Sequence, residues 1–104
     1  MSYTRVNYDD VESKAGLYFL RDELDCENLG ISVIDVEDGR EGPPHDHADG
    51  DQEEVYVLTE GAGTLTVAGE EISLQPGDAV RVDPELTRQL TLEGDSQMVI
   101  VGAP

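Results

Sequence analysis

The sequence has 104 residues, enough for one small domain with its own core, and its 24 acidic and 6 basic side chains give a formal net charge of −18. That charge disfavours nucleic acid and anionic membranes as partners. No apolar run approaches the roughly 20 residues of a membrane-spanning helix, and the N-terminal residues lack the apolar core of a signal peptide, so we expect a cytoplasmic protein.

The acidic side chains are spread along the chain rather than gathered in a tail, and Lys14 is the only lysine. Repulsion among so many like charges destabilises a compact chain unless salt screens it, and the Debye length falls to about 3 Å at molar salt. The composition resembles that of proteins from salt-accumulating haloarchaea, which implies a halophilic protein. An acidic surface that docks a basic partner or mimics nucleic acid is the alternative.

Residues 1–28 lack a sustained stripe of apolar residues at helical spacing. Their pattern predicts one short strand at Leu17–Leu20 and at most a turn or two of helix near Tyr8–Ser13. We expect them to form an N-terminal arm that packs on a barrel made by residues 29–104. Glycine-containing turn signals in the barrel separate short strand-like runs at Ile31–Val36, Glu54–Leu58, Thr64–Val67, Glu71–Leu74, Ala79–Val82, Gln89–Leu92 and Met98–Val101. Short strands at this spacing predict an all-β sandwich or barrel.

Two of these runs are apolar on both faces. In Glu54–Leu58, Val55 and Val57 share one face while Tyr56 lies on the other, and Met98–Val101 has the same character. A strand that is apolar on both sides belongs between two layers or under a partner. We therefore expect a homodimer formed by sheet packing or strand exchange.

Both histidines of the chain, His45 and His47, lie in an acidic stretch between the first two of these runs. Residues two apart on an extended segment point to the same face, so the two rings can converge on one atom, and Glu54 can supply a carboxylate. Two neutral imidazoles and one carboxylate suit a first-row divalent metal with open positions. The pattern predicts a mononuclear site, and histidines that only satisfy local hydrogen bonds are the alternative.

The same stretch resembles the first motif of the cupin superfamily, in which a glycine, a histidine pair, a glutamate and a second glycine follow in order. The matching residues here are Gly39, His45, His47, Glu54 and Gly61, and only the gap before the glutamate is longer than in the motif. Counting back from Gly61 selects Glu54 over Glu53. The resemblance implies a small cupin barrel, which is a double-stranded β-helix or jelly roll.

The second cupin motif supplies a third histidine ligand and then an asparagine. Counting from Gly77, these two positions fall on Arg88 and Leu92, so the spacing is kept while the metal-binding chemistry is lost. A guanidinium stays protonated and cannot coordinate a metal. Either Arg88 pairs with Glu54 and takes the place of the ion, or it turns to the pocket mouth and binds an anionic ligand beside the metal.

Tyr56 shares the face of Glu54 and either presents its hydroxyl to a ligand or fills the core. The sequence thus predicts a small-molecule-binding cupin with Tyr56 and Arg88 as ligand-binding residues. Its metal ligands would be His45, His47 and Glu54, holding one Fe, Mn, Ni or Zn ion. A pocket without a metal is the alternative. The alternatives are a metal-dependent oxygenase or isomerase that uses this triad, and a non-catalytic structural or interaction module.

Overall fold

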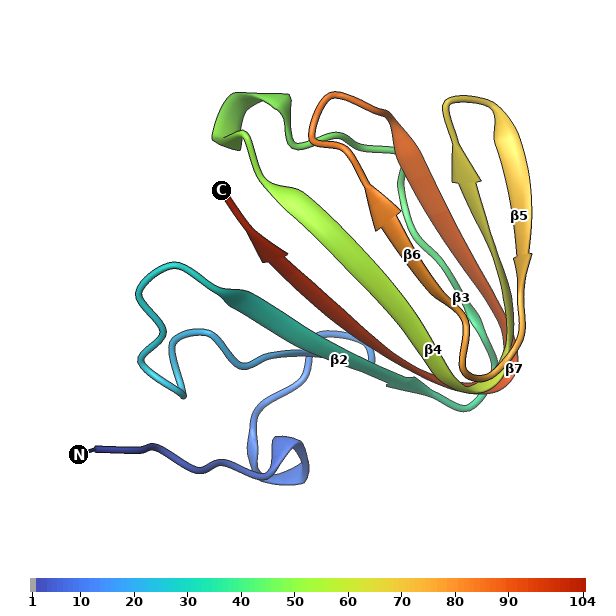
Figure 1. Cartoon of the computed structure of the whole chain (residues 1–104). Helices are drawn as coiled ribbons and strands as arrows, with labels where there is room; N and C mark the ends of the chain where they lie inside the picture. The colour runs from blue at the N-terminus through green and yellow to red at the C-terminus, as the bar shows by residue number, and fades with distance from the viewer. Residues whose placement is uncertain (1) are drawn as a thin grey trace.

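The computed structural model describes residues 2–104 and consists mainly of antiparallel strands (Figure 1). The strands are β1 (Leu17–Phe19), β2 (Gly30–Val36), β3 (Arg40–Glu41), β4 (Glu53–Val67), β5 (Glu70–Leu74), β6 (Ala79–Val82) and β7 (Arg88–Ala103). The sheet order is β1-β2-β7-β4-β5, while β3 pairs with β7 and β6 pairs with β4. The predicted all-β architecture is confirmed.

Helical structure is confined to two single turns of 3-10 helix, η1 (Tyr8–Asp10) and η2 (Ala48–Gly50), among the residues described. The first lies where the sequence predicts a helical turn. Asn7 caps it by accepting a hydrogen bond from the Asp9 N–H at 3.0 Å. Neither turn, nor any other helix in this part of the chain, is long and apolar enough to span a membrane.

The two longest strands run through segments that the sequence predicts as turns. β4 continues past Gly61 and β7 continues past Gly94, so four expected short strands are two long, bent ones. Pairing between β4 and β7 shifts register on either side of Glu60, and the two glycines have φ of 93° and 61°. Such irregularities bend a paired strand instead of ending it, and the prediction of separate strands was wrong here (Figure 1).

Alternation along the strands selects the side chains that face the interior. In adjacent strands Ile34 lies beside Met98, and Met98 lies beside Leu58. The buried cluster consists of Ile34, Tyr56, Leu58, Leu65, Leu74, Val82, Leu92 and Met98. Full burial of one such aliphatic side chain contributes about 1.5–3 kcal/mol. This cluster is therefore a main source of stability, and two of its members, Ile34 and Tyr56, line the same cavity as the histidine pair.

The opposite face of β2, β7 and β4 is also apolar, as the two-sided pattern of these strands indicates. Six half-buried side chains that alternate with the inward-facing ones form this outer aliphatic face: Ile31, Val33, Val55, Val57, Val99 and Val101. Cross-strand register brings Val99 of β7 between Val33 and Val57. The homodimer expected from the sequence stays a prediction, and this face is the surface on which sheets would pack.

The N-terminal residues contribute directly to the sheet. β1 pairs with the edge of β2, where Leu17 lies beside Ile34, close to the strand predicted at Leu17–Leu20. The Tyr8 hydroxyl donates a hydrogen bond to the Asp35 carboxylate of β2 at 2.7 Å. Both contacts hold the arm against β2. The boundary drawn at residue 28 stays a prediction.

Candidate metal centre and ligand cavity

The backbone around the two histidines is fixed by the segment that leads into β7. His45 and Arg88 form an isolated antiparallel bridge, with N–H···O distances of 2.9 and 2.8 Å. Two residues further on, His47 donates its N–H to the carbonyl of Pro84 at 2.8 Å. The two prolines ahead of His45 lack an N–H and cannot extend the pairing of β3. The histidine segment is therefore held at the first residue of β7.

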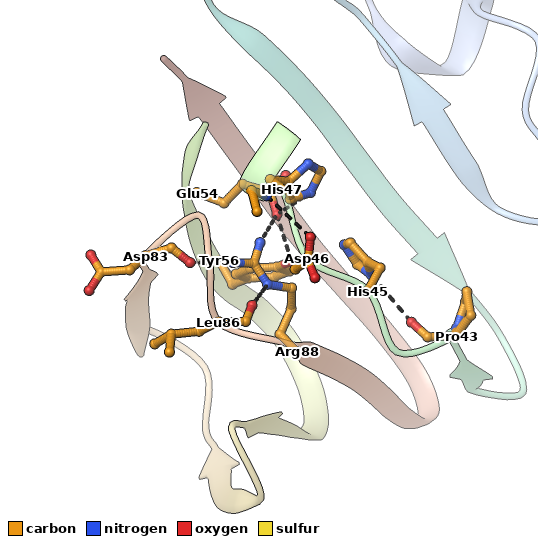
Figure 2. Close-up of polar contacts among 10 residues, drawn as sticks. Pro43, His45, Asp46, His47, Glu54, Tyr56, Asp83, Leu86 and Arg88 are labelled. Carbon is orange, nitrogen blue, oxygen red and sulfur yellow. Dashed lines mark hydrogen bonds and ion pairs between the residues drawn. The ribbon is translucent and has the colours of Figure 1, made fainter. Parts of the chain in front are cut away.

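The two imidazoles lie close together, as their spacing in the sequence predicts. Their ring centroids are 5.0 Å apart and their planes are perpendicular, at 90°. His45 is exposed, and its Nδ1 lies 3.2 Å from the carbonyl oxygen of Pro43. His47 is half-buried and faces Glu54 (Figure 2). The rings differ in their surroundings, since one faces solvent and the other faces the acid.

Glu54 Oε1 is the point where the polar side chains meet. The Tyr56 hydroxyl donates to it at 2.7 Å and the Arg88 Nη1 at 3.1 Å, while the His47 Nε2 lies 3.1 Å away. Among the residues described, no hydrogen bond reaches the second oxygen, Oε2. One oxygen of the carboxylate thus fixes its orientation, and the other is left to act as a ligand.

Neighbouring Glu53 points to the opposite side of β4. Its carboxylate accepts hydrogen bonds from the Arg81 Nε at 3.0 Å and from the Arg81 Nη2 at 2.8 Å, on the exposed surface. Successive side chains on a strand alternate between faces, so only one of the two glutamates can face the histidines. The structure brings Glu54 to them, in agreement with the count from Gly61.

Arg88 lies beneath Glu54 in the interior of the barrel. Its side chain has no exposed surface, and its remaining hydrogen bonds go from Nε to the Leu86 carbonyl at 3.0 Å and from Nη2 to the Asp83 carbonyl at 2.6 Å. A buried cation needs such partners because desolvation is costly. Of the two arrangements considered for Arg88, the structure contains the pair with Glu54. A direct contact between Arg88 and a ligand stays a prediction.

The donor set fits a divalent metal ion in composition and in spacing. One potential ligand atom from each of His45, His47 and Glu54 lies within 4.8 Å of the other two. Nitrogen and oxygen ligands at 2.0–2.2 Å from one ion lie about 3 Å apart, and the His47 Nε2 lies 3.1 Å from the Oε1 of the carboxylate whose Oε2 would bind the ion. The His47 Nε2 is also buried and lacks a hydrogen-bond partner, because that short contact does not have hydrogen-bond alignment.

A cavity of about 330 Å³ opens directly beside this donor set. Its polar lining includes His45, His47, Glu54 and Tyr56. The apolar part of the lining consists of Leu17, Phe19, Ile34, Pro43, Leu90 and Ile100. Small-molecule sites typically have volumes of about 300–1,000 Å³ and an apolar wall with a few convergent polar groups. The cavity has the character of a site for a small ligand, and Arg88 is not among its lining residues.

Tyr56 combines a core position with a polar contact at the cavity. Its side chain is almost fully buried, and burial raises the pKa of its hydroxyl, followed by the hydrogen bond to Glu54. The hydroxyl therefore stays protonated at neutral pH and acts as a donor to the carboxylate. Tyr56 fills the core, as one of the two predicted roles requires, while a contact between its hydroxyl and a ligand stays a prediction.

Sequence reasoning missed Arg40 and the arm residues that line the cavity. Arg40 belongs to β3, a strand of two residues that the strand patterns do not predict, and Leu17 and Phe19 come from β1. One signal for Arg40 was available, because it is a lone cation five residues ahead of His45 in an otherwise acidic stretch. No sequence pattern indicates that β1 closes the cavity, since that depends on the pairing of β1 with β2.

A family model of the cupin domain matches residues 32–103. The chain belongs to the cupin family. No curated protein matches the sequence of this cupin. The family match and the observed sheet together confirm the small cupin barrel that the motifs predict. The match begins within β2 and ends at the last residue of β7, so it includes the whole donor set.

Several solved structures are similar to this cupin along most of its length. A cupin protein from Bacteroides fragilis is 26% identical and has a TM-score of 0.80, covering 99% of this chain and 85% of that chain. KdgF from a Halomonas species is 18% identical, with a TM-score of 0.76 and coverage of 100% and 94%. A sugar phosphate isomerase of the cupin superfamily from Silicibacter pomeroyi is 19% identical, with a TM-score of 0.75 and coverage of 96% and 75%.

Proposed function

We propose that this cupin binds a small molecule in the barrel cavity, next to one divalent metal ion held by His45, His47 and Glu54. The observation that carries the proposal is the His47 Nε2, which is buried without a hydrogen-bond partner at the wall of the cavity. A buried nitrogen left in this state costs about 1–3 kcal/mol, so a partner is expected for it. Coordination of a metal would supply that partner.

The surrounding residues support such a site by orienting its carboxylate. Tyr56 and Arg88 both donate to the Oε1 of Glu54, and these two hydrogen bonds fix the carboxylate so that Oε2 can act as the ligand. Fe, Mn, Ni and Zn all suit two imidazoles and a carboxylate, and three protein ligands leave positions for the small molecule. When bound, the ion acts as a Lewis acid that polarises an oxygen of that molecule.

A second candidate function is a metal-dependent isomerase or oxygenase that uses the same triad. The position of Tyr56 favours it, since its hydroxyl lies beside Glu54 at the cavity wall, where it can help to orient a substrate. The structures from Silicibacter pomeroyi and Acidithiobacillus ferrooxidans are described as a sugar phosphate isomerase and a putative one, at 19% and 22% identity, which supports a common fold alone. Catalysis therefore ranks below ligand binding.

The experiment begins with protein stripped by a chelator and dialysed. Fe(II), Mn(II), Ni(II) or Zn(II) is then added, and metal content and the thermal midpoint Tm are measured. We expect close to one equivalent of metal per chain, and an ion at 100 times its Kd adds about 2.7 kcal/mol of stability. His47→Ala should lose both effects, because it removes one of three ligands.

Glu53→Gln is the matched control, because it removes the adjacent carboxylate that faces Arg81 and should bind metal like the wild type. Less than about 0.2 metal per chain in the wild type, with no shift in Tm for any of the four ions, would remove the metal from the proposal. The Arg88–Glu54 pair would then occupy the ion's place in a metal-free pocket. Equal binding by His47→Ala and the wild type would place the metal elsewhere.

A further inference from the structure

The six basic side chains of this acidic cupin fall into different environments. Arg81 and Arg88 are neutralised by carboxylates, at Glu53 and Asp83 on the surface and at Glu54 in the interior. The positive charges of these two arginines are therefore already balanced by carboxylates and are poorly placed to attract an anionic ligand.

Arg40 and Arg21 are bound only to backbone carbonyls. Arg40 Nη1 donates to the carbonyl of Ala15 at 2.9 Å, and Arg21 Nη2 donates to the carbonyl of Glu27 at 3.1 Å. Within residues 2–104, no carboxylate oxygen lies within 4.0 Å of either guanidinium. Arg5 and Lys14 also lack an ion pair among the described residues, but neither of them lines the space beside the histidines.

Both arginines line the space beside the metal-ligand candidates. Arg40 lines the cavity of about 330 Å³, and Arg21 lines an adjoining pocket of about 240 Å³. The two spaces share part of their walls, including His47 and Glu54. Arg40 also pairs through its backbone with Leu92, a core residue, so its side chain starts on the inward-facing side of the sheet.

We propose that the cavity takes a small organic anion and that Arg40 binds its carboxylate or phosphate group. The inference rests on the proposed function, since it names the ligand class of the same cavity. A guanidinium presents two parallel N–H groups that match a carboxylate or a phosphate. The apolar wall formed by Leu17, Phe19 and Ile34 suits the hydrocarbon part of such a ligand. Arg21, which is exposed, adds a second positive charge in the adjoining pocket.

The overall charge of the protein makes this local cation necessary for an anionic ligand. A net charge of −18 repels anions at long range, so an anion enters only where nearby positive charge outweighs that field. Added salt screens the long-range repulsion more than it screens a contact inside a cavity. The affinity for an anion is accordingly expected to hold or to rise as KCl increases.

Arg40 also has a structural contact, because it joins β3 to the carbonyl of Ala15 in the N-terminal arm. A purely structural role would make its replacement lower stability without changing the preference between charged and neutral ligands. Arg40→Gln keeps N–H donors for that carbonyl while it removes the positive charge. The charge preference of binding is therefore the readout that separates the two roles.

The test measures binding by calorimetry for two pairs of probes that differ in charge: phenylacetate against phenylacetamide, and glycerol 3-phosphate against glycerol. We expect at least one of the two anions to bind about tenfold more tightly than its neutral counterpart, and the pair that responds tells a carboxylate ligand from a phosphate ligand. Arg40→Gln should remove that preference. Arg81→Gln, which removes a guanidinium of β6 on the sheet face opposite to Glu54, should retain it.

Equal binding within both pairs, or a preference for the anion that survives in Arg40→Gln, overturns the inference. Running the same titrations on metal-free and metal-loaded protein separates this result from the metal proposal. An anion preference that depends on Arg40 in metal-free protein supports the inference even if no metal binds. Metal uptake without any anion preference leaves the metal proposal standing and removes this one.

Discussion

The guanidinium of Arg88 and the carboxylate of Glu54 form an ion pair at 3.1 Å, in which the arginine side chain is fully buried. Arg88 stands where the second cupin motif supplies a histidine, so a fixed positive charge replaces a metal ligand. The same arginine is tied to the carbonyls of Leu86 and Asp83. The pair therefore links the segment before β7 to β4.

Arg88→Met should destabilise the protein by about 3–5 kcal/mol, because it leaves Glu54 buried without its cation. The double variant Arg88→Met/Glu54→Gln should recover part of that loss, since neither charge is then left alone. Urea denaturation of the wild type, the two single variants and the double variant measures the coupling between the residues. Additive losses in the double variant would show that the pair contributes no coupling.

Arg88→His should increase affinity for Zn(II) or Ni(II) by tenfold or more. The change removes a positive charge, and at about 4 Å such a charge repels an ion by roughly 4 kcal/mol per unit of metal charge at an effective dielectric of 20, which Glu54 offsets in part. It also adds an imidazole at the third histidine position. Competition titration with a chromogenic chelator measures the change, and Arg81→His is the control. An unchanged Kd would mean that Arg88 does not limit metal binding.

The Tyr8 hydroxyl should make stability fall at alkaline pH. Its hydrogen bond to Asp35 raises the pKa of Tyr8 from 10.0 to about 12, with smaller contributions from burial and from the negative charges nearby. A folded pKa above the unfolded one contributes stability that is complete below pH 10 and is lost as the pH rises toward 12. Denaturation midpoints of the wild type and Tyr8→Phe, measured from pH 8 to 12, should therefore converge.

The control for this pH series is Tyr3→Phe, because Tyr3 is largely exposed, at 89%. Its midpoints should follow those of the wild type over the whole range. A constant difference between Tyr8→Phe and the wild type from pH 8 to 12 would contradict a role for the ionisation of Tyr8.

The sequence predicted the parts of the site that depend on local spacing. Residues two apart place the histidines together, and the count back from Gly61 selects Glu54, which the structure brings to them while Glu53 faces Arg81. The direction of Arg88 depends on carbonyl acceptors at Asp83 and Leu86, which no residue pattern specifies because every residue has a carbonyl. The sequence therefore left two arrangements open where the structure has one.

The errors in the strand pattern have a similar physical origin. Glycines at 61 and 94 indicate turns on local grounds, but a glycine with positive φ also serves a bend in a paired strand. A side chain at Gly61 would collide with the backbone of Asp95 in the partner strand. Whether such a glycine forms a turn or a bend therefore depends on long-range pairing between strands. The positions of Arg40 and Phe19 in the cavity wall likewise depend on the pairing of β3 with β7 and of β1 with β2.

A second copy of the chain should pack on the outer aliphatic face. The six side chains of that face carry no charge, whereas like charges make the rest of the surface repel another copy. Val99 lies on the central strand of the face, so Val99→Glu should convert a dimer to a monomer in light scattering coupled to size exclusion at molar KCl. Ser73→Glu adds the same charge at an exposed position of β5 and is the control. A monomeric wild type, or a dimeric Val99→Glu, would contradict this arrangement.

The thermal midpoint should rise as KCl increases from about 0.1 to 2 M, because salt shortens the Debye length from about 10 Å to below about 3 Å and screens the repulsion among the acidic side chains. Each kcal/mol gained raises Tm by about 4–8 °C in a domain of this size. A variant in which the exposed acids Asp49, Asp51, Glu70 and Glu71 become amides should start from a higher Tm at low salt and gain less from KCl. A midpoint that does not rise in the wild type would contradict a halophilic protein. The acidic surface would then be better explained as a docking surface for a basic partner.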